Sequence, residues 1–143
     1  MTSLTGAIGS PVACIVQHLL SLSSITDVVD QKVFGGALPS GAAQMKNMIA
    51  VRAAGGLSDL DVIAIHRPRL EIRCYGETDE EAELIYHLVY AALNGQTGIQ
   101  ANDTLCKSIW MASKGANLFD ENVNKPFMLA FMDSIFQTEK VSA

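Results

Sequence analysis

Two residue pairs in this chain have the types and spacing that could do chemistry. Cys14 and His18 lie four residues apart, as do Glu83 and His87, and side chains at that spacing share one face of a helix. A thiolate and an imidazole could be two ligands of a zinc ion, but structural zinc needs four and no second Cys/His pair accompanies them. The carboxylate and imidazole could form an acid–base dyad, although a local charge pair explains the same spacing. Neither pair on its own predicts a site.

The other reactive side chains are better explained as local structure. Asp79, Glu80 and Glu81 could form a carboxylate cluster for a metal ion. They also suit the positive end of a helix dipole, which explains them fully. Neither a phosphate-binding glycine loop nor a serine nucleophile motif is present. We therefore expect no catalytic residue, no cofactor-binding residue, no metal ligand and no enzyme activity.

The composition is that of an acidic chain with enough apolar residues for one folded domain. It has 143 residues, 49% of them hydrophobic and 17% charged, which excludes wholesale disorder. A net charge of -5 with only 10 Lys plus Arg provides no basic patch that would grip nucleic acid. No apolar run reaches the roughly 20 residues of a membrane helix, so we expect no membrane partner. Three cysteines set far apart among apolar residues indicate buried free thiols of a reducing compartment: Cys14, Cys74 and Cys106.

The strongest local signal is a strand followed directly by a capped helix. Apolar and polar residues alternate from Pro68 to Tyr75, which predicts a strand with one buried face. Because proline cannot donate to a ladder, the strand should start, bulge or lie at a sheet edge at Pro68. Thr78 and Glu81 form a T-x-x-E capping box, in which the Glu81 carboxylate would reach back to the Thr78 N–H. The helix should then run over residues 79–93 and end at Asn94-Gly95.

Apolar periodicity and turn residues predict the remaining elements. Residues 1–9 are small and polar and predict a flexible arm, which leaves residues 10–143 as a single domain. The predicted elements, in chain order, are a helix at 10–22, strands at 28–34, 47–53 and 62–75, the helix at 79–93, and strands at 105–112 and 127–138. Segments around 35–46, 55–61 and 113–126 are predicted to be loops. The predicted fold class is α+β, with a mixed, mainly antiparallel sheet of about five strands packed with two main helices in the order α-β-β-β-α-β-β.

The final strand is apolar on both sides. Its residues alternate between two sets: Phe127, Leu129, Phe131 and Ile135 on one face, and Met128, Ala130, Met132 and Phe136 on the other. Such a strand needs cover on both faces. Either the helices flank the sheet on opposite sides, or one face is covered by the arm, a loop or another subunit.

The polar side of the third strand is a candidate subunit interface. Its members fall at every second position: Arg67, Arg69, Glu71, Arg73 and Tyr75. A solvated strand face explains this pattern. The functional alternative is contact between subunits, because Arg and Tyr are enriched at interfaces and Arg–carboxylate pairs can set register. An Arg-rich face for nucleic acid is a third interpretation, which the acidic total disfavours. A second set of charges, in predicted loops, suits either solvent or intersubunit pairs: Asp59, Asp61, Lys114, Asp120, Glu121 and Lys125.

Three segments resemble the tail terminator (tail completion) proteins of long-tailed bacteriophages, including the lambda-type terminator. MIAVRAAGG at 48–56 looks like the family's central strand with its glycine turn. RPRLEIRCYGETDEEAELIYHLVYAALNG at 67–95 looks like its strand and long helix, and KPFMLAFMDSIFQT at 125–138 looks like its final strand. The matching features are patterns of residue type rather than catalytic fingerprints.

This resemblance implies a virion structural protein. Tail terminators form a ring, typically a hexamer, that caps the tail tube, stops its polymerisation and provides the joining surface to the capsid neck. The implied partners are further copies of the chain, the tail tube protein and a neck or head–tail connector protein. DNA would pass through the lumen without specific binding, which an acidic protein suits because like charges repel. The implied location is the neck end of the virion tail, after synthesis and assembly in the host cytoplasm, and the loop charges become candidate contacts to tube or neck.

Two alternatives stay open at this point. Other phage neck, head–tail connector or minor capsid proteins share similar patterns. A protein of another class would be a small metal- or ligand-binding domain or an enzyme, built on Cys14 with His18 or on Glu83 with His87.

Overall fold

The computed structural model describes residues 10–60, 65–101 and 104–138, and the predicted arm at residues 1–9 lies outside them. The elements in chain order are α1 (Pro11–Leu20), α2 (Ser23–Val29), β1 (Val33–Gly35), the short 3-10 helix η1 (Ala42–Gln44), β2 (Met48–Leu60), β3 (Ile65–Tyr75), α3 (Asp79–Leu93), β4 (Ile99–Ala101), β5 (Thr104–Met111), β6 (Ala116–Asp120) and β7 (Lys125–Thr138). The predicted α+β class is confirmed. The described residues hold seven strands and three α-helices, more than the sequence predicts.

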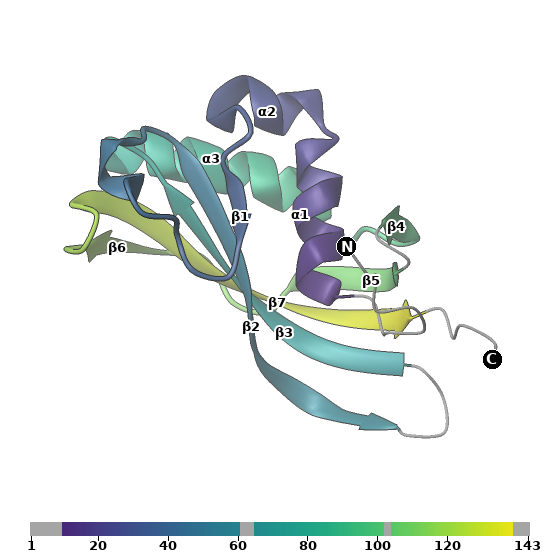
Figure 1. The fold of residues 1–143 in the computed structure, drawn as a ribbon. Coiled ribbons are helices and arrows are strands. Elements are labelled where there is room, and N and C mark those ends of the chain that lie inside the picture. The colour runs from purple at the N-terminus through teal and green to yellow at the C-terminus, as the bar shows by residue number, and fades with distance from the viewer. Residues whose placement is uncertain (1–9, 61–64, 102–103, 139–143) are drawn as a thin grey trace.

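One mixed sheet contains all of these strands. Its order is β1-β2-β3-β7-β5-β4. β6 pairs with the first part of β7, at residues 125–129, whereas β5 pairs with the later part, at residues 132–138. β1 runs parallel to β2, whereas the other pairs are antiparallel, so the predicted mixed, mainly antiparallel sheet is confirmed. The long hairpin of β2 and β3 extends beyond the helices (Figure 1).

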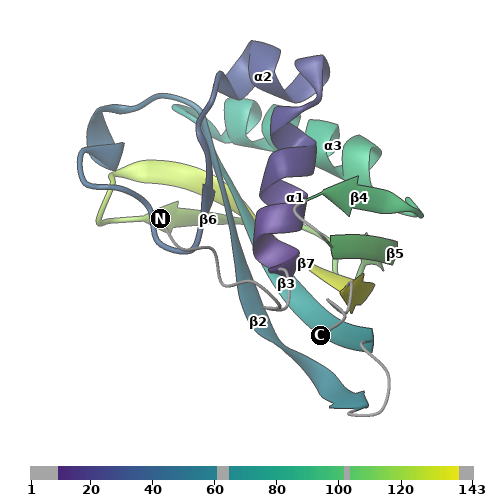
Figure 2. The same cartoon turned by 45° about the vertical axis from the view of Figure 1, so that its right-hand side comes forward.

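The three helices lie on one side of the sheet (Figures 1 and 2). Buried residues from α1, α2 and α3 join those of β2, β3, β5 and β7 in a single apolar cluster. The interpretation in which the helices flank opposite faces is therefore wrong, because the alternate positions that they cover all project to one side. No single helix in the described ranges is long and apolar enough to cross a membrane; α1 and α2 pass that test only together, as a pair bent by 86°.

The opposite side of the sheet, which we call the open face, has apolar cover at one end only. A second cluster forms there, and its buried members are Ala42, Met48, Ala50, Tyr75, Val123 and Phe127. Leu38 and Met45, from the segment between β1 and β2, pack against this cluster, as does Leu129 of β7. A loop thus covers part of the second apolar face of β7, as one predicted alternative has it. Phe131 and Ile135, farther along β7, are only partly buried.

The predicted strand at 28–34 is largely wrong. Residues 28 and 29 belong to α2, and β1 begins only at Val33. Ile25 and Val29 lie four apart and are both buried in the core, so the helix places them on one face. Burial of this pair outweighs the strand preference of the β-branched residues.

β2 continues through a glycine pair that the sequence predicts to be a turn. Gly55 and Gly56 lie inside the strand, and β2 holds one more residue than β3 between Ala53 and Gly56. This β-bulge faces Pro68, which pairs with Gly56 and lies between β2 and β7. None of the three roles predicted for Pro68 holds for its own strand: β3 begins at Ile65, it is paired on both sides, and the extra residue of the bulge belongs to β2.

Two short strands were not predicted. β6 lies in the segment predicted to be a loop at 113–126, and β4 lies between the helix predicted at 79–93 and the strand predicted at 105–112. β6 forms a regular hairpin with β7, with Ala116 opposite Leu129 and Asp120 opposite Lys125. Asn124 in its turn has φ of 55°, a left-handed conformation that asparagine adopts more readily than most residues. β6 has only five residues and a composition typical of loops, so its alternation of apolar and polar residues is too short to predict a strand.

The capped helix is confirmed in nearly every detail. α3 runs from Asp79 to Leu93, and the Glu81 N–H donates to Thr78 Oγ1 at 3.2 Å. The Glu81 carboxylate accepts from the Glu77 N–H at 3.4 Å rather than from Thr78. Gly95 follows with φ of 77°, as expected of a residue that ends a helix.

The bulge yields a test of local strain. At Gly56, φ is 130° and an added Cβ would lie 2.4 Å from the Arg67 carbonyl oxygen, whereas at Gly55 φ is 88° and no atom lies within 4 Å. We expect Gly56→Ala to lower the free energy of unfolding by about 3 kcal/mol, because strain adds to a clash with backbone. The control Gly55→Ala should cost about 1–2 kcal/mol, from the positive φ alone. Urea denaturation measures both, and equal losses would contradict this account of the bulge.

Candidate functional site

The open face carries most of the polar groups that could recognise a partner. Alternation along β3 puts Arg67, Arg69, Glu71, Arg73 and Tyr75 on it. The register sets Arg69 opposite Asp133 and Arg73 opposite Leu129 on β7, and Arg52 of β2 opposite Glu71. Charged and apolar side chains from three strands therefore meet on one surface.

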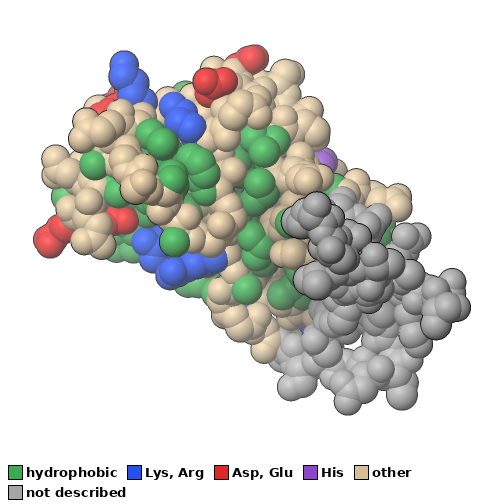
Figure 3. Space-filling view, viewed as in Figure 1, with side chains coloured by type: hydrophobic (Ala, Val, Ile, Leu, Met, Phe, Trp, Pro, Cys, Tyr) green, Lys and Arg blue, Asp and Glu red, His purple; other side chains and the backbone are tan. Residues whose placement is uncertain are grey.

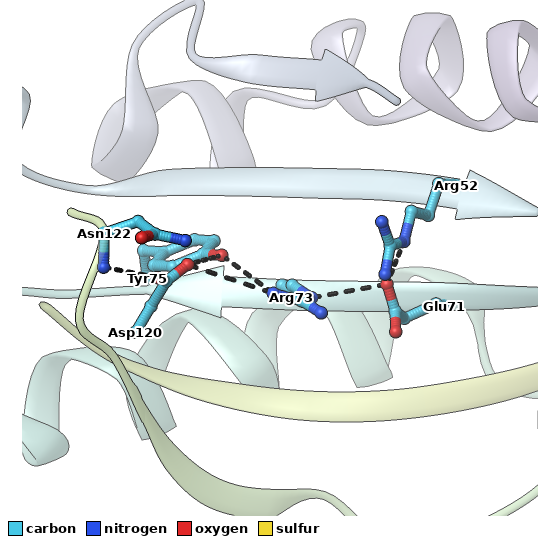
Figure 4. A network of polar contacts seen from close by, with 6 residues as sticks. All are labelled: Arg52, Glu71, Arg73, Tyr75, Asp120 and Asn122. Carbon is cyan, nitrogen blue, oxygen red and sulfur yellow. Dashed lines mark hydrogen bonds and ion pairs between the residues drawn. The ribbon is translucent and has the colours of Figure 1, made fainter. Parts of the chain in front are cut away.

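A buried carboxylate organises one end of this surface. Glu71 is only 7% exposed, and its Oε2 accepts from Nε of Arg52 and from Nε of Arg73, the latter at 3.3 Å (Figure 4). A carboxylate taken out of water needs such partners, since its desolvation is costly otherwise. Glu71 thus links β2 to β3 on the face opposite the helices.

Tyr75 extends the network to the β6–β7 hairpin. Its hydroxyl donates to Asp120 Oδ2 at 2.9 Å and accepts from Arg73 Nη1 at 3.4 Å. Burial raises the pKa of Tyr75, which keeps the phenol protonated so that it can donate. Asp120 Oδ1 in turn accepts from the Asn122 N–H at 3.0 Å (Figure 4). The turn of the hairpin is thereby fixed to the centre of the sheet.

The network lines an open pocket of about 310 Å³ between the sheet and the segment after β1. Arg52 and Arg73 contribute two positive charges to its lining, and Glu71 and Asp120 contribute two negative ones. The Arg73 guanidinium also lies 5.0 Å from the centre of the Phe127 ring, a favourable cation–π distance. Because the charges balance and are paired with one another, the pocket is better explained as a structural joint than as an ion site.

The predicted interface residues differ in how much they offer to a partner. Glu71 and Tyr75 are buried within the chain, and Arg73 is largely so. Arg69 is exposed and forms an ion pair with Asp133, with Nε 3.0 Å from Oδ1. Arg67 is partly buried. Subunit contact by this set stays a prediction, and its accessible members are Arg67 and Arg69.

The predicted loop charges fall into different settings. Lys114 and Glu121 are exposed in connections between strands, as predicted. Asp61 lies outside the described residues. Asp59 belongs to β2 rather than to a loop, because the strand continues beyond the glycine bulge.

Asp120 and Lys125 were also wrongly assigned to a loop. They are the last residue of β6 and the first of β7, and they face each other across the hairpin. Asp120 is held by Tyr75. Lys125 is buried, with Nζ 2.9 Å from Glu77 Oε1. Both side chains support the hairpin from within the chain.

A groove at the other end of the open face contains a residue that sequence reasoning missed. It measures about 560 Å³ and is lined by Ala54, Gly56, Arg67, Arg69, Trp110, Asp133, Ser134 and Ile135. Trp110 is the chain's single tryptophan, and 39% of it is exposed. Tryptophan and arginine are the residues most often found at interface hot spots, so the one tryptophan in a strand was the available signal.

The two residue pairs that could do chemistry, Cys14 with His18 and Glu83 with His87, are not assembled into sites. The Cys14 thiol donates to the Thr104 carbonyl at 3.8 Å, which turns the sulfur toward β5. Glu83 accepts from Asn117 Nδ2 at 3.1 Å, and His87 is exposed beside the Tyr86 ring. Across residues 10–60, 65–101 and 104–138, no three His, Cys, Asp or Glu side chains lie close enough to hold a metal ion.

The same fold occurs in a chain of a gene transfer agent virion. One chain in the solved structure of the virion of a native gene transfer agent particle aligns with 96% of this chain and 99% of its own length, with a TM-score of 0.71. The two sequences are 13% identical over this alignment, so the likeness is one of fold. No family model matches the sequence, and no curated protein matches it either.

The network around Glu71 can be tested by substitution. Glu71→Gln should lower the free energy of unfolding by about 2 kcal/mol, because two guanidinium groups lose their charged partner. Asp133→Asn is the matched control, since it breaks the exposed pair with Arg69 and should cost less than about 1 kcal/mol. Chemical denaturation at neutral pH measures the two variants. A Glu71→Gln loss no larger than that of the control would show that the buried pairing contributes little.

The cysteines provide a test of the core. All three are fully buried, and burial raises the pKa of each thiol, that of Cys106 to about 12. We expect no reaction with a thiol reagent at pH 8 in the native protein and three equivalents in denaturant, because the reactive thiolate is scarce and shielded. Rapid labelling of any cysteine in the native protein would show that this part of the core opens.

Proposed function

We propose that this chain is a virion structural protein that forms a ring and acts as a tail terminator at the end of a phage tail tube. The observation that carries the proposal is the fold shared, over nearly the whole of both chains, with a protein of the gene transfer agent virion. The three segments that resemble tail terminators lie in β2, in β3 with α3, and in β7, which together form the centre of this fold. The terminator role itself rests on that resemblance.

The surface of the chain supports an assembly role. Trp110, Leu118 and Phe119 are large apolar residues that stay exposed on one sheet, and contact with another protein would remove them from water. In the view of Figure 3, Lys and Arg side chains lie in small groups among apolar and acidic ones. Such a mixed surface suits contact with proteins. It also suits DNA that passes without being gripped, which needs no basic stripe.

The role that we propose involves no turnover and no cofactor. The polar network of Glu71, Arg73 and Tyr75 then serves to hold the sheet rigid. A neck or head–tail connector protein is the neighbouring alternative, because it would share the fold and the ring. The two roles differ in one measurable action: a terminator stops the growth of a tube.

The test uses the purified full chain and a phage tail tube protein. Light scattering should give the mass of a closed oligomer, which we expect to be a hexamer, and electron microscopy should show a ring at one end of each tube. Added during tube polymerisation, the protein should shorten the tubes in proportion to its concentration. A chain that stays monomeric with tubes present would overturn the proposal. A ring that leaves tube length unchanged would favour the connector.

A further inference from the structure

We propose that copies of this chain join head to tail, with the β6–β7 hairpin tip of one copy seated in the Trp110 groove of the next. The tip consists of residues 118–122, and the groove is the hollow around Trp110, Ile135, Arg67 and Arg69 described above. This inference rests on the proposed function, since it specifies how the ring would be built.

The tip presents two apolar side chains and a carboxylate, with Leu118 and Phe119 on opposite faces of β6. Leu118 is 46% exposed and Phe119 is 55% exposed. Glu121 is exposed in the turn that follows, whereas the neighbouring Asp120 is already engaged by Tyr75. Glu121 is therefore the carboxylate that the tip can offer to a second molecule.

The groove presents the complementary chemistry. Trp110 and Ile135 provide an apolar wall, and Arg67 and Arg69 provide positive charge. The Arg69 pair with Asp133 is exposed on both sides, and such pairs contribute little to stability. Arg69 can thus exchange Asp133 for a carboxylate from another copy, while Phe119 packs against the indole of Trp110.

The tip is rigid before it binds. Asp120 is fixed by Tyr75 at 2.9 Å and accepts from the Asn122 N–H at 3.0 Å, and the adjoining Val123 is buried in the cluster on the open face. At the base of the hairpin, Lys125 is buried and paired with Glu77. A segment that is ordered in advance loses less entropy on docking.

The two surfaces are well separated on one copy. The tip precedes the first residue of β7, and the groove lies near Asp133 to Ile135 of the same strand. Leu118 and Phe119 pair with Phe127 and Pro126, so six to nine residues of β7 separate them from the groove, which is about 20–30 Å at ~3.3 Å per residue. When a tip binds a groove on another copy, an open assembly always keeps one unoccupied tip and one unoccupied groove at its ends. Both are occupied only when the assembly closes into a ring. Docking of the tip into the groove of its own copy is excluded by that distance.

Light scattering of single-site variants is the first arm of the test. Trp110→Ala removes the groove wall, and Phe119→Ser removes the apolar group of the tip. We expect each variant alone to be monomeric at concentrations where the wild type forms rings. Mixed together, they should form 1:1 dimers and nothing larger, because only one productive tip and one productive groove remain. Rings from either variant alone, or no dimer in the mixture, would overturn the inference.

A charge exchange is the second arm. Arg69→Glu and Glu121→Arg should each shift assembly to at least tenfold higher concentration, and the double variant should recover it. Asp27→Arg and Lys46→Glu make the same charge changes at exposed positions on α2 and before β2, and they should leave assembly unchanged. Thermal melting of each monomer confirms that the fold survives.

The outcomes separate this inference from the function on which it rests. Wild-type rings together with unimpaired variants would overturn the tip-and-groove contact and leave the terminator proposal standing. Rings that persist in the variants but no longer bind tube ends would assign the groove to the tube protein instead, which also overturns the contact. A wild type that never assembles, with or without tubes, would overturn both.

Discussion

A sheet with two apolar faces and helices on only one of them is the constraint on which the rest of the structure depends. β7 alternates apolar side chains to both sides, and α1, α2 and α3 cover one side alone. The open face therefore has to be protected in some other way. At one end, the segment between β1 and β2 folds over Met48, Tyr75 and Phe127. At the other end, Trp110 and Ile135 stay accessible around a groove. The division of the open face into a closed half and an accessible half follows from the shortage of cover.

The closed half is specified by polar pairing rather than by apolar packing alone. Glu71 would be costly to bury without Arg52 and Arg73. Once they are in place, Tyr75 can reach Asp120, and the β6–β7 hairpin is held against the sheet. A buried polar network of this kind selects one arrangement, because each member is satisfied only when the others are. The predicted interface strand thus has two functions along its length, an internal joint at Tyr75 and an accessible surface at Arg69.

The sequence predicts best where local and tertiary signals agree. α3 has a capping residue, acidic residues in its first turn, an apolar stripe and a terminal glycine, and its bounds are as expected. α2 was missed because Val28 and Val29 favour a strand locally, while burial of Ile25 with Val29 favours a helix. The glycine pair in β2 suits a turn as well as a bulge, and only pairing with the neighbouring strand distinguishes the two.

The same reasoning explains what was predicted of the site. Alternation alone predicts that every second residue from Arg67 to Tyr75 lies on one face, because the period of a strand is read directly from sequence. Burial of Glu71 and Tyr75 could not be read in this way, since it depends on Arg52 from β2 and Asp120 from β6, which are distant in sequence. The loop assignment of Asp120 and Lys125 failed for a related reason: a five-residue strand becomes visible only when β7 is beside it.

The open face separates paired charges from accessible apolar and basic groups. The charges around the pocket beside Glu71 are paired with one another. Cys14, Cys74 and Cys106 are buried in the core, where their raised pKa values suppress reactivity. The accessible groups of the sheet include a tryptophan, two arginines and a hairpin tip bearing two apolar side chains. These groups gain free energy by leaving water against another protein surface, and a chain that exposes two such surfaces at opposite ends of one strand is suited to repeated self-association.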